Sequence, residues 1–485
     1  MGGIAGIWGR NDPELVRWMS GRLTHRGPDS LGTHHGVDPP VDLGYTRLAV
    51  TDIGGGDQPM YSPSGNVLVA NSEICNAGML RGLLGPHRFA SRSDSEAILH
   101  LLGDEGCGAT SRLRGFFAFA MLLEGDLVLG RDPFGIKPLY LADHEGALVF
   151  ASELKALPDG VTEVRELEPG TVFSAASGLH RYFTLHRQRP LNGSFETHAA
   201  RVRRALERAV RLRLASDVPV GAFLSGSLGD SAVAALMSRY TGELHTFSVG
   251  LAGSRELWAA RRVSAHLGTI HHEHVLEPAE VLEELPTVVE SLEAFGRDLV
   301  RAAVPMHFAA RLASRHVKVV LTGVGADALF AGQERHRGID DPEVLDNAVV
   351  ESLRSLHDVE LRRLDHLTMA RGVEARVPLL DLDVVAAALS VPIELRRPGF
   401  CSGDKAVLRS AVADLLPHDV TWRDEAGAGG DPGPWDSLWE QVASVIGDTT
   451  REHPGPCRSA EECHYHAILG AALGDLDPLM TAISH

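Results

Sequence analysis

The sequence predicts a two-domain α/β protein, with stacked antiparallel sheets in the first part and a parallel sheet in the second. The chain has 485 residues, more than a single hydrophobic core usually serves. Short apolar strands separated by Gly, Asp and Pro turns dominate up to about residue 190, and strands that alternate with helices follow from about residue 195. We therefore expect one domain over residues 1–190 and another over residues 195–485.

Strands form most of the first domain in this interpretation. They are expected in "LGYTRLAVTD", "NVLVANSE" and "FFAFAMLLEGDLVLGRD", where apolar residues alternate or run together between turn residues. Helices are expected in "DPELVRWMSGRL" and in "SDSEAILHLLGDEG", which starts with serine and aspartate, residues that cap helices. Many strands with few helices favour stacked antiparallel sheets.

The second domain follows the polar stretch "RQRPLNGSFE". Here "THAARVRRALERAVRLRLAS" and "SRELWAARRVSAHLG" have helical periodicity, and "VPVGAFLSGS", "LHTFSVGL", "TIHHEHVL" and "VKVVLTGVG" are typical of buried strands. This alternation predicts a parallel sheet covered by helices, followed by a mostly helical remainder. Ligands of such sheets bind beyond the carboxyl ends of the strands, so the glycine loops at 225–231 and 323–327 are the predicted site.

Composition and charge argue against several classes of function. The net charge of −18 opposes binding to phosphate backbones, so we expect no nucleic-acid partner. The longest apolar run, 116–123, is too short to cross a bilayer, and no secretory signal is visible, so we expect a cytoplasmic protein without a membrane partner. The five cysteines are odd in number and sparse, which is typical of reduced thiols. The spacing of Cys457, Cys463, His464 and His466 fits no common zinc pattern.

Eleven short segments of the chain are distinctive together. They are "GGIAGIWG", "LTHRGPDS", "TRLAVTDIGGGDQPM", "NSEICN", "SDSEAIL", "RDPFGIKPLY", "ASELKAL", "VPVGAFLSG", "TFSVG", "LTGVGADALFAG" and "GVEARVPLLD". In this order they resemble the glutamine-hydrolysing asparagine synthetase family over nearly the whole chain. The resemblance implies an N-terminal class II glutaminase-like domain with an Ntn-type αββα sandwich. It also implies a C-terminal synthetase domain of the adenine nucleotide α-hydrolase-like fold, and a homodimer.

The resemblance also implies the family's chemistry. In the family, a cysteine at the exposed amino terminus attacks glutamine, and the free amine serves as the base. Ammonia then reaches the second domain, where a loop of sequence SGGLDSS holds ATP, a carboxylate is adenylated and ammonia displaces AMP. Some relatives that close lactams or lasso peptides use an internal amine in place of glutamine.

The residue that carries the glutaminase nucleophile in the family is absent from this chain. Gly2 stands where the family has cysteine, and it supplies no thiolate. Ser72 replaces the glycine of the family's NGE motif, where its side chain adds bulk. The positions that match the family's glutamine-binding residues are Arg47, Asn71, Glu73 and Asp94. We expect no glutaminase activity and interpret these four residues as holding loops together.

The nucleotide loop is altered as well. The family's SGGLDSS reads SGSLGDS over residues 225–231, with Ser227 in place of the second glycine. The aspartate that coordinates magnesium in the family is displaced by one position to Asp230, and one residue on a helix turns a side chain by about 100°. The bulk of Ser227 hinders the approach of backbone N–H groups to a phosphate.

A second acidic loop has also lost its functional side chains. The family's GEGADE reads GVGADA over residues 323–328, so that Val324 replaces one glutamate and Asp327 alone remains of the metal ligands. The lysine of the family's W-R-x-K pattern is Glu425 here, an anion where a polyphosphate would lie. These losses predict weak binding of ATP or none, within a scaffold whose other motifs are intact.

The C-terminal cleft keeps carboxylates beside arginines, which are competent acid–base groups when burial tunes them. The candidate catalytic residues are Asp230, Asp327, Ser225, Arg301 and Arg423. The candidate nucleotide-binding residues are Leu224, Ser225, Gly226, Ser227, Val249 and Gly323. Asp327 and Asp230 are the acidic residues left for a metal ion. We expect no cofactor, and ATP with Mg²⁺ belongs only to the alternative below.

Three functional hypotheses remain open. The first is an enzyme repurposed within this fold, which acts without glutamine or ATP on a small or peptide-like specialised metabolite, by amide, lactam or ring formation or by hydrolysis. The second is an ATP-dependent amide synthetase that uses free ammonia or an internal amine. The third is a catalytically silent regulatory or scaffold partner. The sequence identifies neither the substrate nor the direction of the reaction.

Overall fold

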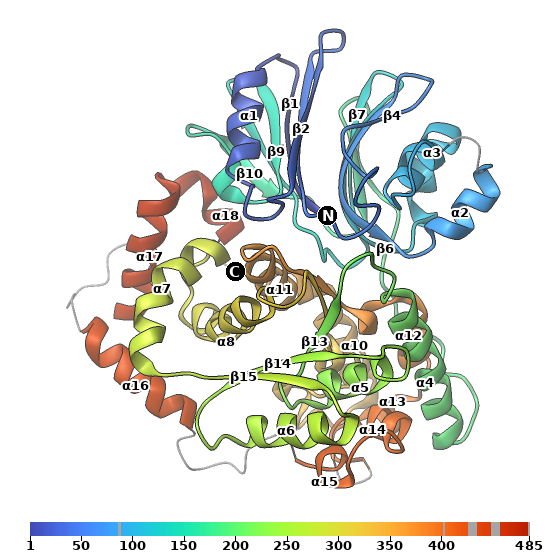
Figure 1. The fold of residues 1–485 in the computed structure, drawn as a ribbon, viewed down its shortest axis with the longest axis vertical. Helices are drawn as coiled ribbons and strands as arrows, with labels where there is room; N and C mark the ends of the chain where they lie inside the picture. The colour runs from blue at the N-terminus through green and yellow to red at the C-terminus, as the bar shows by residue number, and fades with distance from the viewer. Residues whose placement is uncertain (86–88, 401–402, 425–433, 448–455, 484–485) are drawn as a thin grey trace.

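The chain folds into two α/β domains, one on stacked antiparallel sheets and one on a parallel sheet, which confirms the predicted fold class (Figure 1). The computed structural model describes residues 1–85, 89–400, 403–424, 434–447 and 456–483. Glu425, for which a role is predicted above, lies outside these residues. The first domain lies above the second in Figure 1, and the amino terminus lies between them.

The first sheet of the N-terminal domain has the strand order β10-β8-β9-β1-β3-β2. Its strands are β1 (Gly2–Trp8), β2 (Ser30–Gly36), β3 (Val41–Arg47), β8 (Tyr140–His144), β9 (Ala147–Ala151) and β10 (Thr162–Glu166). Helix α1 (Pro13–Gly21) packs on β1 and β3. This helix begins where the sequence predicts, because Asp12 accepts a hydrogen bond from the Leu15 N–H and Pro13 occupies the first turn.

The second sheet has the order β12-β11-β7-β6-β5-β4 and carries two helices on its outer face (Figure 1). Its strands are β4 (Met60–Tyr61), β5 (Val67–Ile74), β6 (Gly115–Leu123), β7 (Asp126–Arg131), β11 (Thr171–Ser174) and β12 (Gly178–Arg181). The helices are α2 (Ala77–Leu84) and α3 (Glu96–Glu105). Ile4, Val69 and Leu129 belong to a buried core between the two sheets, which makes this domain an αββα sandwich.

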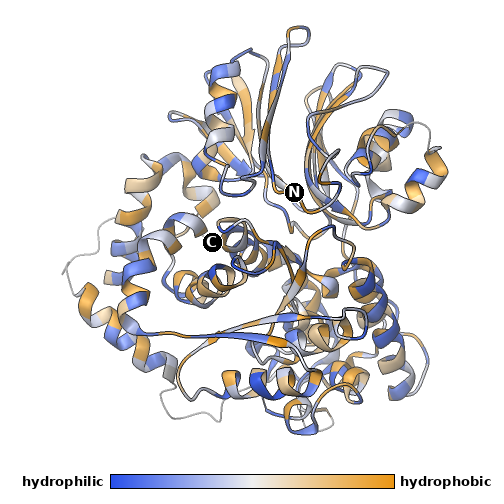
Figure 2. Cartoon of the chain, in the orientation of Figure 1, coloured by the Kyte–Doolittle hydropathy of each residue, from blue (hydrophilic) through white to orange (hydrophobic). Residues whose placement is uncertain are grey.

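The C-terminal domain is built on a five-stranded parallel sheet of order β15-β14-β13-β16-β17. Its strands are β13 (Val220–Phe223), β14 (His245–Gly250), β15 (Ile270–Val275), β16 (Val319–Leu321) and β17 (Glu374–Arg376). The helices that precede or link them are α4 (Phe195–Leu212), α5 (Leu228–Met237), α6 (Arg255–Leu267), α7 (Pro278–Leu292), α8 (Arg297–Ala313) and α9 (Ala326–Leu329). Figure 2 shows apolar residues along the strands of both domains.

Among the described residues after α9, β17 is the one strand and the other regular elements are helices, of which the last returns to the first domain. These helices are α10 (Pro342–Arg354), α11 (Glu360–Met369), α12 (Leu382–Leu389), α13 (Ile393–Arg396), α14 (Ala406–Val412), α15 (His418–Thr421), α16 (Pro434–Ile446), α17 (Ala460–Leu473) and α18 (Met480–Ile483). Helix α18 contacts β10, where the Thr481 hydroxyl donates a hydrogen bond of 2.9 Å to the Val164 carbonyl. Among the described residues, no helix combines the length and apolar character needed to traverse a membrane.

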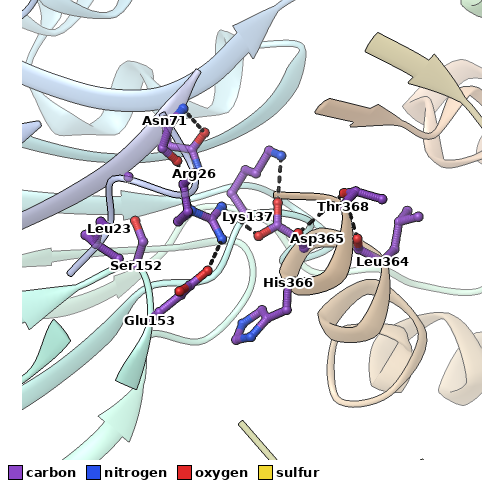
Figure 3. A network of polar contacts seen from close by, with 12 residues as sticks. Leu23, Arg26, Asn71, Lys137, Ser152, Glu153, Leu364, Asp365, His366 and Thr368 are labelled. Carbon is purple, nitrogen blue, oxygen red and sulfur yellow. Dashed lines mark hydrogen bonds and ion pairs between the residues drawn. The ribbon is translucent and has the colours of Figure 1, made fainter. Parts of the chain in front are cut away.

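A buried network of charges joins the two domains (Figure 3). Arg26 contacts Glu153 of its own domain at 2.6 Å and Asp365 of α11 at 2.7 Å. Lys137 contacts the other oxygen of Asp365, also at 2.7 Å. Burial alone would raise the pKa of Asp365, but the Arg26 and Lys137 cations lower it below its ordinary value. Arg26 also donates a hydrogen bond to the Gly2 carbonyl, so the network holds the beginning of β1 in place.

Candidate functional site

The beginning of β1 lies where the two domains meet (Figure 1). The Gly2 N–H donates a hydrogen bond of 3.2 Å to the side-chain oxygen of Asn71. A Cβ atom placed on Gly2 would lie 1.8 Å from the Thr46 carbonyl oxygen on the neighbouring strand β3, far inside van der Waals contact. A cysteine side chain therefore does not fit at this position unless β1 and β3 move apart.

The predicted glutamine pocket is a cavity of about 20 Å³, lined in part by Arg47, Glu73 and Asp94. That is space for about one water molecule, far too little for an amino acid. Arg47 donates to the Asp52 carbonyl at 2.7 Å, and Asp94 accepts from the Ile74 N–H at 2.5 Å. The structure thus brings Arg47, Glu73 and Asp94 together in the lining and places Asn71 beside Gly2. Arg47 and Asp94 form hydrogen bonds within their own domain.

The fourth predicted residue, Glu73, is bound by the second domain. Its side chain lies 3.1 Å from Arg376 of β17, which also contacts Glu374 at 2.6 Å. Burial raises the pKa of Glu73 to about 8, and the nearby Glu374 carboxylate adds to the effect, whereas Arg376 opposes it. Burial also lowers the pKa of the Met1 amine, which lines the same cavity. The pocket floor is therefore an interdomain contact in which burial disfavours the charged forms of Glu73 and of the Met1 amine.

Two of these contact residues have no role in the sequence-based prediction. Glu374 and Arg376 belong to the segment "GVEARVPLLD", which the sequence identifies only as scaffold. Ser72, predicted to add bulk, forms a hydrogen bond of 2.9 Å with Ser95.

The predicted loop at 225–231 comprises the turn after β13 and the first turn of α5, at the carboxyl edge of the parallel sheet. Ser227 caps α5, because its hydroxyl accepts a hydrogen bond of 3.3 Å from the Asp230 N–H. Gly226 has φ +85°, and a Cβ there would lie 2.3 Å from the Glu256 carbonyl oxygen of α6. Arg423 donates a hydrogen bond of 2.7 Å to the Gly226 carbonyl. The structure therefore places Arg423 beside the loop and packs the loop against α6.

The carboxylate of Asp230 turns inward and is occupied by four donors. One oxygen accepts hydrogen bonds from the Ser225 N–H at 3.1 Å and the Ser225 hydroxyl at 2.5 Å. The other accepts from the Thr322 hydroxyl at 3.0 Å and the Gly323 N–H at 2.6 Å. Asp230 is buried and ties the two predicted loops to each other. Thr322 was not predicted, although a hydroxyl residue directly after an apolar strand is a signal that could have drawn attention to it.

The two loops also touch through their backbones at Gly229 and Gly323. A Cβ on Gly229 would lie 2.7 Å from the Gly323 carbonyl oxygen and 2.8 Å from the Cβ of Ala326. A Cβ on Gly323 would lie 2.0 Å from the carbonyl carbon of Gly229. Gly229 stands where the family has its metal-binding aspartate, and the observed packing leaves no space for that side chain.

Asp327 lies at the start of α9 and remains half exposed, with 49% of its side chain accessible. Its carboxylate forms an ion pair of 2.7 Å with Lys405, the buried residue that precedes α14. Within the described residues, neither Asp327 nor Asp230 belongs to a group of three or more potential metal ligands. The structure therefore gives the two predicted metal ligands separate partners.

The other predicted residues lie in two places. Leu224 is buried at the end of β13, where its N–H donates a hydrogen bond of 2.8 Å to the Phe247 carbonyl, and Val249 is half buried near the end of β14. Arg301 belongs to a contact between α8 and α17, in which it pairs with Glu461 and lies over the Trp439 ring. The structure brings Leu224 and Val249 to the same sheet edge as the loop. Arg301 is held by Glu461 of α17 and not by residues of the loop.

Comparison with known families matches both halves of the chain. Residues 201–344 and 339–467 match the family model described as asparagine synthase. Residues 1–204 match the model described as a glutamine amidotransferase domain.

Several curated proteins are similar over most of the chain. Glutamine-hydrolysing asparagine synthetase 2 of Arabidopsis thaliana is 35% identical over 429 residues, which cover 84% of this chain and 74% of that protein. Asparagine synthetase B of Escherichia coli K12 is 34% identical over 464 residues, which cover 90% of this chain and 82% of that protein. Among solved structures, glutamine phosphoribosylpyrophosphate amidotransferase from B. subtilis, complexed with ADP and GMP, is similar with 21% identity and a TM-score of 0.34, covering 58% of this chain and 70% of that one.

Proposed function

Because this chain belongs to the asparagine synthase family, we propose that it is an amide-chemistry enzyme of that family that works without glutamine hydrolysis and without ATP. Its substrate in this proposal is a small or peptide-like specialised metabolite, bound in the C-terminal domain. One observation carries the proposal. At Gly2 and at Gly229, where the family chemistry needs a side chain, a Cβ would lie 1.8 Å and 2.7 Å from a neighbouring carbonyl oxygen.

The electrostatics of residues 225–231 support the proposal that ATP does not bind there. Phosphates bind at such loops through free backbone N–H groups. Here the N–H groups of Ser225 and Gly323 already donate to the carboxylate of Asp230. A phosphate would have to displace this anion and would be repelled by it. Asp230 therefore has a structural role in the proposal, in place of the metal-binding role.

The ion pair of Asp327 and Lys405 is the proposed chemical centre. Its carboxylate is half exposed and its ammonium group is buried, 2.7 Å away. A carboxylate and an ammonium at this distance can accept and return a proton at an amide nitrogen. In this arrangement Lys405 orients Asp327, and Asp327 contacts the substrate.

Activity measurements on the purified protein test the proposal. With glutamine alone we expect no glutamate above the buffer rate, and with aspartate, ammonia, ATP and Mg²⁺ we expect no pyrophosphate. With extracts of the source organism we expect a metabolite to change without ATP consumption. Asp327→Asn should abolish this change, and the exposed control Asp298→Asn should retain it.

The other outcomes select the other hypotheses. Release of pyrophosphate with a carboxylic acid would select the ATP-dependent amide synthetase that uses ammonia or an internal amine. No change in any metabolite, with or without ATP, would select the silent regulatory partner.

The proposal includes a cytoplasmic homodimer. The acidic charge of −18 and the small number of cysteines suit a protein of the cytoplasm. Sedimentation at several concentrations measures the oligomeric state, and a monomer at all of them would contradict the dimer.

A further inference from the structure

Three histidines from separate segments meet at the amino edge of the parallel sheet. His245 is the first residue of β14, His272 lies on the adjacent β15, and His316 lies between α8 and β16. Their ligand nitrogen atoms all lie within 4.8 Å of one another. Parallel strands all begin at this edge and end at the other, where the 225–231 loop lies. The cluster is therefore separate from the candidate functional site.

Two of the three rings meet nitrogen to nitrogen. His245 Nδ1 and His272 Nε2 share a hydrogen bond of 2.9 Å, with ring planes 4° apart. An N–H···N bond needs one ring nitrogen with a proton and one with a free lone pair, so at least one of these rings presents a lone pair to the cluster. His316 stacks on His272 with ring centroids 3.8 Å apart, and Phe247 lies against His272 at 5.2 Å.

The surroundings of His272 disfavour its charged form. Burial lowers the pKa of His272, and His316 and His245 lower it further, because two imidazolium ions this close repel each other. Neutral imidazole is the form that binds metal ions. A set of nitrogen ligands without carboxylates suits Zn²⁺, Cu²⁺ or Ni²⁺ rather than Mg²⁺ or Ca²⁺.

We propose that His245, His272 and His316 form a binding site for a divalent transition-metal ion such as Zn²⁺. Tetrahedral zinc has Zn–N bonds of about 2.0–2.1 Å, which requires neighbouring ligand nitrogens to lie roughly 3.3 Å apart. The nitrogens of His245 and His272 need to separate by only a few tenths of an ångström from the observed 2.9 Å. The proton between them moves to the other nitrogen of its ring, so both rings stay neutral.

The exposed His316 completes the set of protein ligands. It lies in a connection after α8, and its exposure leaves its ring free to turn from the stack toward the ion. Three protein ligands leave a tetrahedral ion one position for water. The ion would link β14, β15 and the connection from α8 to β16, so that binding stabilises this edge of the sheet.

The second group of possible ligands in the described residues offers a contrast. Glu166, His357 and Asp358 also gather, but Arg131 contacts Glu166 at 2.6 Å. The Arg131 guanidinium occupies the place that a metal ion would take. It lowers the pKa of Glu166 to about 2, although burial alone would raise it. Within the part of the chain that the structure describes, no arginine or lysine pairs with the histidine cluster in this way.

Zinc titration of the full-length, chelator-treated protein tests the site. We expect one Zn²⁺ per chain by calorimetry, a rise in Tm, and a visible absorption band typical of tetrahedral Co²⁺ when cobalt replaces zinc. His316→Ala and His272→Ala should each weaken binding by at least about tenfold, the size of effect that loss of an outer partner already has. His316 is exposed, so its variant should keep the fold of the unmodified protein.

Two controls locate the binding. His266→Ala removes an exposed histidine of α6. Cys463→Ser changes the separate group of cysteines and histidines over residues 457–466. Both variants should bind Zn²⁺ with unchanged affinity. Absence of saturable binding to the unmodified protein would overturn the proposal. Equal affinity in the His316 and His272 variants would also overturn it, since the ion would then be held elsewhere.

Discussion

Glu73 of the first domain and Arg376 of the second lie 3.1 Å apart, Oε1 to Nη1, inside the protein. The same guanidinium contacts Glu374 at 2.6 Å, so two buried carboxylates share one arginine. Among the described residues, the second oxygen of Glu73 has no hydrogen-bond partner. A carboxylate in this position is costly when charged, which is why burial favours its protonated form.

This arrangement predicts a stability that falls as the pH rises. With its pKa raised to about 8, Glu73 holds a proton in the folded protein that the unfolded chain releases near pH 4.5. Its contribution is fully present below the unfolded pKa and is lost as the pH rises through the folded pKa, by up to about 1.4 kcal/mol per pH unit. Glu73→Gln should flatten the dependence of Tm on pH between 5 and 8, measured by calorimetry. Parallel Tm curves for the two proteins would contradict the assignment.

A second prediction concerns the beginning of β1. Gly2→Ala should destabilise the protein by about 1–3 kcal/mol, the usual cost of overpacking, because its Cβ overlaps the Thr46 carbonyl. Gly2→Cys should have a similar cost and should not restore glutaminase activity. Gly21→Ala is the matched control, since nothing lies within 4 Å of a Cβ at that position. Thermal unfolding compares the three variants, and a Gly2→Ala protein as stable as the control would show that β1 moves freely.

The contact of Gly229 with Gly323 leads to a third prediction. Gly229→Asp introduces a carboxylate against the Gly323 carbonyl oxygen, 2.7 Å from the new Cβ. We expect a loss of about 1–3 kcal/mol of stability from the steric overlap. Calorimetry with ATP and Mg²⁺ should detect no binding by this variant. A variant that keeps the original Tm and binds ATP would show that the loops can separate.

The interdomain charge network provides a fourth prediction. Asp365→Asn removes the anion shared by Arg26 and Lys137, and breaking a buried ion pair costs about 3–5 kcal/mol. Arg10→Ala breaks a pair with Glu145, whose side chain is 71% exposed, and should cost less than about 1 kcal/mol. Calorimetry of both variants measures the contrast, and limited proteolysis should cut Asp365→Asn faster between its domains. Equal Tm values for the two variants would place the domain contact elsewhere.

Most of the fold could be predicted because the local signals are strong. The run "FFAFAMLLEGDLVLGRD" became β6 and β7, and "SRELWAARRVSAHLG" became α6, capped by Ser254 as its sequence indicates. Helix α2 and strand β17 were not predicted. Strand β17 has only three residues, and it exists because β16 lies beside it, which no local pattern records.

The positions of single site residues could be predicted from the sequence, but their contacts with distant segments could not. The resemblance located Asp230 and Gly229 on the loop. Thr322, which donates a hydrogen bond to Asp230, and Gly323, which packs against Gly229, come from a distant segment. Arg301 was assigned to the cleft, and its engagement with Glu461 depends on where α17 packs. His272 belongs to the predicted strand "TIHHEHVL", and local sequence could not reveal its cluster, because His245 and His316 come near it only in the folded sheet.

The contact of α18 with β10 has a consequence for synthesis on the ribosome. Strand β10 is at the edge of its sheet, and the Val164 carbonyl on it is bonded by Thr481, near the carboxyl end of the chain. The first domain emerges long before Thr481 is translated, so its sheet edge stays uncovered while the second domain is made. Uncovered edges are sites of mispairing between chains. Fast production of this protein should therefore favour aggregation of nascent chains, and slower translation or a holdase chaperone should raise the soluble yield.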